Sequence, residues 1–130
     1  MEAANVQLHL LLAIINGIET AGALLDALPY KAKGQGKKRF DLALRRLFPI
    51  SYSNAGKELN LYSQLRSHLV HCMLPSKHVH LTSSEVSHLT FSEKVLHISL
   101  PVLFKDYCCA MDELISLIES SKLKNKKIFF

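Results

Sequence analysis

The sequence contains no tryptophan, and its aromatic content is only 8%. A hydrophobic core must therefore be built mainly from Leu, Ile, Val and Ala side chains. No internal repeat and no low-complexity block is present. The hydrophobic fraction of 48% and the charged fraction of 21% are those of an ordinary globular domain, which excludes wholesale disorder. A chain of 130 residues is long enough to bury one such core.

Cysteine is scarce as well. Cys72 stands alone, and Cys108 and Cys109 are adjacent. An odd, low count does not make a disulfide framework and is typical of a reducing compartment. We therefore expect a cytoplasmic protein, in which the adjacent pair serves packing rather than nucleophilic catalysis.

Long hydrophobic runs are almost absent. The run from Leu10 to Ile15 is closely flanked by His9, Asn16 and Glu19. It is far shorter than the roughly 20 apolar residues of a membrane span. Glu2 also stands where a signal peptide carries positive charge. We therefore expect a soluble protein that does not associate with a membrane.

Positive charge is in excess, with a formal net charge of +5 and a pI of about 9.2. Such a balance suits a polyanionic partner, because neutralised phosphates release their counterions. Part of the excess is a C-terminal lysine cluster, which would also be explained as a solvated tail. We therefore divide the chain into a helical domain at 1–122 and a basic tail at 123–130.

Hydrophobic periodicity predicts four helices. The first covers about residues 4–28, with one stripe at Leu11, Ile14, Ile18, Ala21, Leu25 and Leu28. A second strip of Leu8, Leu12 and Ile15 makes this helix either central in the fold or a contact to another subunit. The second helix covers about 37–48, and the third covers about 55–73 after a connector at 51–53. The last begins near Pro101, with a stripe of Phe104, Tyr107, Met111, Leu114 and Ile118.

Residues 78–99 alternate between apolar and polar, which is the period of short strands. Ser92–Lys94 is expected to turn a hairpin. The predicted fold is thus mainly α: a four-helix-bundle-like single domain with a small β-hairpin before the last helix.

Arg66 is the most informative residue. In a regular helix Leu59, Tyr62, Val70 and Met73 lie within about 40° of it, so a cation is embedded in an apolar stripe. In one interpretation, its aliphatic stem packs in this stripe while the guanidinium reaches solvent or a carboxylate such as Glu19 or Asp106. The alternative is a guanidinium held in a cleft to grip a phosphate.

His71 follows Arg66 by five positions, so the two lie about 140° apart on an ideal α-helix. They would converge only if the helix unwinds before Pro75, or if two chains combine their residues. A histidine near a helix C-terminus can also serve merely as a partner of the helix dipole.

The context of this pair resembles the HEPN (higher eukaryotes and prokaryotes nucleotide-binding) helical-bundle family. The resemblance rests on the string Leu61–His71, followed by Leu74-Pro75, with Tyr62 just ahead of Arg66 and His71 just before the turn that ends the helix. The strings Ile18–Gly22, Lys38–Phe40 and Leu47–Pro49 are similar to the earlier helices of bacterial members. Nearly the whole chain is covered.

The resemblance implies a metal-independent ribonuclease, often a toxin or defence protein, whose Arg and His meet at a dimer interface. His71 would handle the proton of an RNA 2′-hydroxyl, and Arg66 would stabilise charge on the scissile phosphate. A homodimer with its interface near these two residues is therefore expected, and a protein antitoxin is a further candidate partner. No cofactor is implied.

A second function stays open. Active members usually carry Asn, Asp or His after the Arg, whereas this chain has Ser67, and many members only bind nucleic acid, nucleotide or protein. Tyr62, Ser67 and His68 would then be binding residues. So would the basic positions of the second helix, which otherwise form a solvated face: Lys37, Lys38, Arg39, Arg45 and Arg46.

A metal site is not expected. His68, His71 and Cys72 lie near one helix end, and His78 and His80 share one strand face, but their spacing matches no zinc signature.

Overall fold

The computed structural model describes residues 2–58, 61–67, 79–85 and 88–120. It is mainly helical, with a small sheet before the last helix, as predicted. The helices are α1 (Glu2–Leu25), α2 (Gly36–Leu47), α3 (Ile50–Glu58), the π-helix η1 (Tyr62–Ser67) and α5 (Leu100–Glu119). The strands are β1 (Val79–Thr82), β2 (Thr90–Ser92) and β3 (Val95–Ser99).

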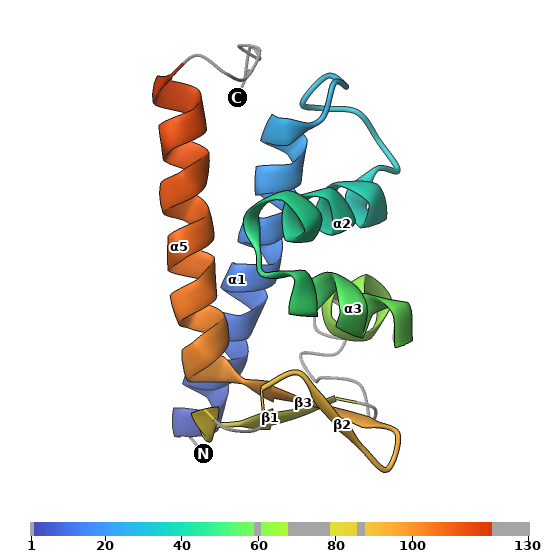
Figure 1. Ribbon diagram of the computed structural model, residues 1–130, viewed down its shortest axis with the longest axis vertical. Coiled ribbons are helices and arrows are strands. Elements are labelled where there is room, and N and C mark those ends of the chain that lie inside the picture. Colours follow the sequence, from blue (N-terminus) through green and yellow to red (C-terminus); the bar gives the residue numbers. More distant parts are fainter. Residues whose placement is uncertain (1, 59–60, 68–78, 86–87, 121–130) are drawn as a thin grey trace.

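Helix α1 lies at the centre of the fold. It runs beside α5 in the same direction, while α2 and α3 cover its other side and the sheet lies at one end (Figure 1). Its predicted stripe is confirmed for Leu11, Ile14, Ile18 and Ala21, which are buried, whereas Leu28 lies beyond the end of α1 and is 41% exposed. Ile15 belongs to the second strip, which predicts either a central helix or a contact to another subunit, and it is only 1% exposed. That strip is therefore largely used within the chain.

The segment Val6–Leu25 of α1 is long and apolar enough to cross a membrane, judged by length and composition alone. Its most apolar side chains pack against neighbouring helices, since Leu11, Ile14 and Ile18 belong to the core cluster. A core helix of this kind passes the same test, so α1 is no clear sign of a membrane protein.

The boundaries of the middle helices differ from the prediction. The expected connector at 51–53 lies inside α3, which begins at Ile50 directly after Pro49. Pro49 ends α2 and also suits the start of the next helix. Its fixed φ is compatible with the first turn, where its missing N–H would have no partner in any case. Of the single helix expected at 55–73, the structure describes α3 up to Glu58 and the π-helix η1 at Tyr62–Ser67, whereas residues 59–60 and 68–73 lie outside the described residues.

The sheet has the strand order β1-β3-β2. β2 and β3 form the predicted hairpin, and Glu93 and Lys94 turn it with φ values of 53° and 65°. Two positive φ angles are what a two-residue turn of type I′ requires. β1 is one of the short strands expected within residues 78–99, but its parallel pairing with β3 was not predicted. Val79, Leu96 and Ile98 bring the inner face of this sheet into the core.

Helix α5 begins where β3 ends. Ser99 caps it by accepting a hydrogen bond from the backbone N–H of Val102. The stripe predicted for its core side is partly wrong: Phe104 and Ile118 are 46% and 45% exposed, whereas Leu100, Leu103, Ala110 and Leu114 are buried. The helix carries apolar residues on two faces, and periodicity alone does not tell which face meets the core.

Candidate functional site

Arg66 lies on the π-helix η1. A π-helix bonds residues five apart, whereas an α-helix bonds residues four apart, so the backbone at Arg66 departs from the regular α-helical register. The structure describes the backbone of Arg66 and Ser67 only, and His68 and His71 lie outside the described residues. Inside η1 the buried Oε1 of Gln64 has no hydrogen-bond partner among the described residues.

Tyr62 begins η1 and connects it to α2. Its ring packs on Phe40 with the centroids 5.6 Å apart. Its hydroxyl reaches the first residue of α2, because a methyl group added to Gly36 would collide with both that hydroxyl and Oε1 of Glu19. The hydroxyl of Tyr62 and the carboxylate of Glu19 therefore meet at Gly36, the first residue of α2.

This place borders a polar pocket of about 370 Å³ between α1, the 26–35 loop, α2 and η1. Glu19 and Thr20 line it from α1, and Tyr62 lines it from η1. The loop and the start of α2 contribute Tyr30, Gln35 and Gly36. Its volume lies within the range of about 300–1,000 Å³ typical of small-ligand sites.

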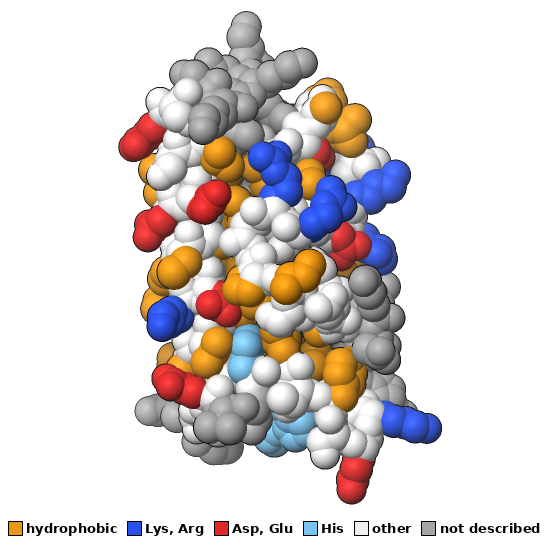
Figure 2. Space-filling view, viewed as in Figure 1, with side chains coloured by type: hydrophobic (Ala, Val, Ile, Leu, Met, Phe, Trp, Pro, Cys, Tyr) orange, Lys and Arg blue, Asp and Glu red, His pale blue; other side chains and the backbone are white. Residues whose placement is uncertain are grey.

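The exposed cations of α2 lie over the same part of the molecule. Figure 2 shows Lys and Arg side chains gathered over α2 and the loop before it. Lys38, Arg45 and Arg46 are exposed, and Lys37 pairs with Asp41 one helical turn away at 2.7 Å. A surface pair of this kind holds its cation only weakly, so all four remain able to meet a polyanion.

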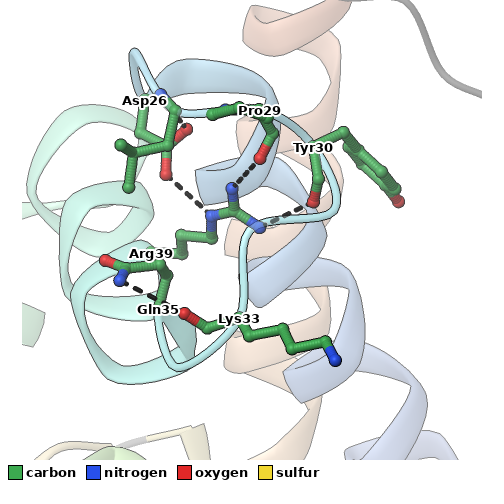
Figure 3. A network of polar contacts seen from close by, with 7 residues as sticks. Asp26, Pro29, Tyr30, Lys33, Gln35 and Arg39 are labelled. Atoms are coloured by element: carbon green, nitrogen blue, oxygen red, sulfur yellow. Dashed lines mark hydrogen bonds and ion pairs between the residues drawn. The ribbon is translucent and has the colours of Figure 1, made fainter.

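Arg39 does not belong to this face, contrary to the sequence expectation. Its side chain is buried, and Nε donates to Oδ2 of Asp26 at 2.7 Å. Nη2 and Nη1 donate to the carbonyl oxygens of Pro29 and Tyr30, at 2.8 and 3.0 Å (Figure 3). The guanidinium thus ties α2 to the loop that follows α1. The cause is local: the chain turns back after Asp26 and leaves carbonyl groups that need a donor.

A second polar network was not predicted. Tyr52 of α3 donates to Oδ2 of Asp106 on α5 at 2.7 Å, and its oxygen lies 2.7 Å from Nε2 of His88. The backbone N–H of Ser99 donates to Nδ1 of His88 at 3.0 Å. Nδ1 is therefore the acceptor, and the neutral ring carries its proton on Nε2 and donates it to Tyr52.

Burial governs the protonation of this network. It lowers the pKa of His88, with Asp106 opposing the change, and it raises the pKa of Tyr52 well above its usual range, with Asp106 adding to the rise. Tyr52 therefore keeps its proton and is no nucleophile. The network joins α3, the β segment and α5. His88 and Asp106 follow Tyr52 by 36 and 54 positions, so no local sequence pattern predicts that they meet.

Among the described residues no three metal-ligating side chains come together. His80 and His97 are neighbours across β1 and β3, with ring centroids 5.4 Å apart, and they form a pair only. His71, Cys72 and His78 lie outside the described residues.

No protein-family model matches the sequence, and neither a curated protein nor a solved structure matches it.

Proposed function

We propose that the protein is a metal-independent RNA endonuclease in which Arg66 and His71 act on the scissile phosphodiester, as the resemblance to HEPN proteins implies. The observation that supports this proposal is the π-helical turn at Tyr62–Ser67. Such turns occur often at functional sites, because they leave backbone and side chains out of the regular α-helical register. Here the turn carries Arg66, next to the buried and unpartnered Oε1 of Gln64 in the described part of the chain.

The proposed chemistry needs one base and one anion binder. His71 takes the proton of the 2′-hydroxyl, the 2′-oxygen attacks phosphorus, and the bond from phosphorus to the 5′-oxygen breaks as that oxygen takes a proton from water. The products are a 2′,3′-cyclic phosphate and a 5′-hydroxyl. Arg66 stabilises the charge that develops on the phosphate oxygens, which a guanidinium grips with two parallel N–H groups.

The basic outer face of α2 supports an RNA substrate. Tyr62 and Phe40 pack η1 directly on α2, whose outer face carries four exposed cations: Lys37, Lys38, Arg45 and Arg46. These residues would contact phosphates on either side of the cleaved bond. They affect binding, whereas Arg66 and His71 affect the chemical step.

The decisive experiment is RNA cleavage in the presence of a chelator. Wild type should yield 2′,3′-cyclic phosphate ends, and Arg66→Ala and His71→Ala should each lower kcat by about 100-fold or more. His80→Ala is the matched control, because His80 is exposed on the sheet. An RNA in which the nucleotide before the scissile phosphate carries a 2′-deoxyribose should not be cleaved there. Equal cleavage by wild type and both variants would exclude the proposal.

A non-catalytic binding module is the second candidate, and the polar pocket favours it. The pocket is large enough for a mononucleotide, and Tyr62, Gln35 and Glu19 supply hydrogen-bonding groups. Calorimetric titration with nucleotides is the test. Binding that Tyr62→Phe weakens, together with absence of RNA cleavage, would favour this function over the first.

The proposal also carries the remaining expectations. A toxin or defence ribonuclease would act in the cytoplasm, and a protein antitoxin would neutralise it. The composite site implied by the family needs a second copy near Arg66 and His71. This part stays a prediction, since the apolar strip of α1 no longer argues for it.

A further inference from the structure

Helix α5 carries two apolar stripes. Leu100, Leu103, Ala110 and Leu114 face the core. The second stripe, called the α5 seam here, is Phe104, Cys108, Met111, Ile115 and Ile118. Phe104, Ile115 and Ile118 are 46%, 51% and 45% exposed, Cys108 is exposed, and Met111 is half-buried. The seam lies about a quarter of a turn around the helix from the core stripe.

The α5 seam has the spacing of a coiled-coil contact. Its residues follow one another at intervals of four, three, four and three, which keeps them on one line along a partner helix. From Phe104 to Ile118 the seam is about 21 Å long. Figure 1 shows α5 along one side of the molecule, and Figure 2 shows hydrophobic side chains among the acidic ones on that side. Such a seam on a helix is a surface for another helix.

Charged residues border the seam on one flank. Lys105, Asp112 and Glu119 follow each other at seven-residue intervals, and all three are exposed. Within one copy Lys105 and Asp112 are two turns, or about 10 Å, apart along the axis, so they do not pair with each other. Their charges are available to a partner.

We propose that the α5 seam binds the α5 seam of a second copy in antiparallel orientation. With the two-fold axis midway between Cys108 and Met111, Phe104 of one copy packs on Ile115 of the other, and Cys108 packs on Met111. This register brings Lys105 of each copy beside Asp112 of the other. Two ion pairs form by symmetry, and the contact closes on itself, which is how most homodimers are built.

A parallel arrangement is less favourable. In a parallel pair the flank that carries Lys105 and Asp112 would lie beside the opposite flank of the partner, so these two charges would not pair with each other, and two helix dipoles would be aligned. The seam is also distinct from the proposed catalytic turn, because η1 packs toward the core stripe of α5, where Leu65 and Leu103 line one cavity. The inference therefore does not rest on ribonuclease activity, and a dimer held by this seam alone would not form the composite site at Arg66 and His71.

Sedimentation equilibrium tests the pairing. A single helix pair lies at the lower end of stable interfaces, which begin at about 1,200 Å² in total, so we expect dissociation in the micromolar range. The mean mass of wild type should rise from 14.6 kDa toward twice that value as concentration increases. A mass that stays monomeric up to about 500 µM would overturn the proposal.

Substitutions distinguish association through this interface from nonspecific hydrophobic association. Ile115→Lys should weaken association by at least about ten-fold, because a charge enters the seam. Ile50→Lys is the control, since Ile50 is 72% exposed on α3, away from the seam. Circular dichroism checks that each variant folds, and Ile118→Lys replaces Ile115→Lys if that variant does not. Equal weakening by the control and the seam variant would exclude the α5 seam.

Charge reversal tests the antiparallel register. Lys105→Asp and Asp112→Lys should each weaken association several-fold, because each variant sets like charges opposite one another twice. The double variant restores opposite charges and should return to within about two-fold of wild type. A double variant that associates no better than the single variants would exclude this register. Monomers that bind neutral lipid vesicles through the seam would show another occupant and would also exclude the proposal.

Discussion

The hydroxyl of Tyr52 lies 2.7 Å from Nε2 of His88, and the direction of every hydrogen bond around that ring requires it to be neutral. A protonated His88 would turn Nδ1 into a donor facing the N–H of Ser99. Burial lowers the pKa of His88 in the folded protein, with Asp106 opposing, so the unfolded chain binds a proton first as pH falls. Stability from this group is complete above about pH 6.5 and is lost as pH decreases below it.

The measurement is the midpoint of thermal unfolding at pH 7.5 and at pH 5. Wild type should lose stability at the lower pH, and His88→Gln should lose less, because glutamine does not titrate. His80→Gln is the control, since His80 is exposed on β1. The same decrease in wild type and His88→Gln would contradict the prediction. At the alkaline end the raised pKa of Tyr52 predicts loss of stability as pH increases above about 10.

Replacing Tyr52 by phenylalanine isolates the hydroxyl. The ring still fits, since it packs on Phe48 and His88 with centroids 5.0 and 5.4 Å away. The carboxylate of Asp106 and Nε2 of His88 lose their common partner, which should lower the free energy of unfolding by about 1–3 kcal/mol. Urea denaturation measures it. A Tyr52→Phe variant as stable as wild type would show that water replaces the hydroxyl without loss.

The ion pair of Arg39 and Asp26 should be far more important than that of Lys37 and Asp41. Side-chain exposures are 8% and 14% in the first pair and 56% and 47% in the second. Arg39→Ala leaves a buried carboxylate and two carbonyl groups without their donor, and should cost about 3–5 kcal/mol. Lys37→Ala, the control, should change stability by less than about 0.5 kcal/mol.

A double variant sharpens that prediction. Arg39→Ala combined with Asp26→Ala removes the isolated carboxylate, so its loss of stability should be smaller than the sum of the two single losses. Arg39→Lys should also be destabilising, because one ammonium group does not reach three acceptors arranged as a fork. Strict additivity in urea denaturation would show that the pair does not act as a unit.

Local patterns predicted the parts of the fold that local forces decide. The core stripe of α1 and the hairpin turned at Ser92–Lys94 both follow from side-chain period, and both are present. The parallel pairing of β1 with β3 and the contacts of Tyr52 depend on residues distant in sequence, which no local pattern reports. Residues 51–53 were assigned to a connector because Ser and Asn compete with helix formation, and packing of Tyr52 overrides that tendency.

Tyr62, which was predicted as a binding residue, lines a polar pocket. No local pattern indicated that Glu19 and Gly36 would meet it there. Arg39 looked like its neighbours Lys37 and Lys38, and only the course of the 26–35 loop reveals its buried role. The stripe predicted for α5 combined residues of two apolar stripes that overlap in sequence, and periodicity alone does not separate the buried stripe from the exposed one.

Gly22 of α1 is expected to be the least replaceable glycine in the described chain. In an ordinary helix, replacing Gly by Ala stabilises by up to about 1 kcal/mol. Here a methyl group would collide with the carbonyl group of Arg39 and lie 2.7 Å from its Cα, so α2 would have to move away from α1. Gly22→Ala should therefore destabilise by about 1–3 kcal/mol or more.

Gly17→Ala is the matched control, because its methyl group meets only the end of the Tyr107 side chain, which can swing aside. Urea denaturation of both variants compares them. A Gly22→Ala variant at least as stable as Gly17→Ala would show that the crossing of α1 and α2 adjusts without loss.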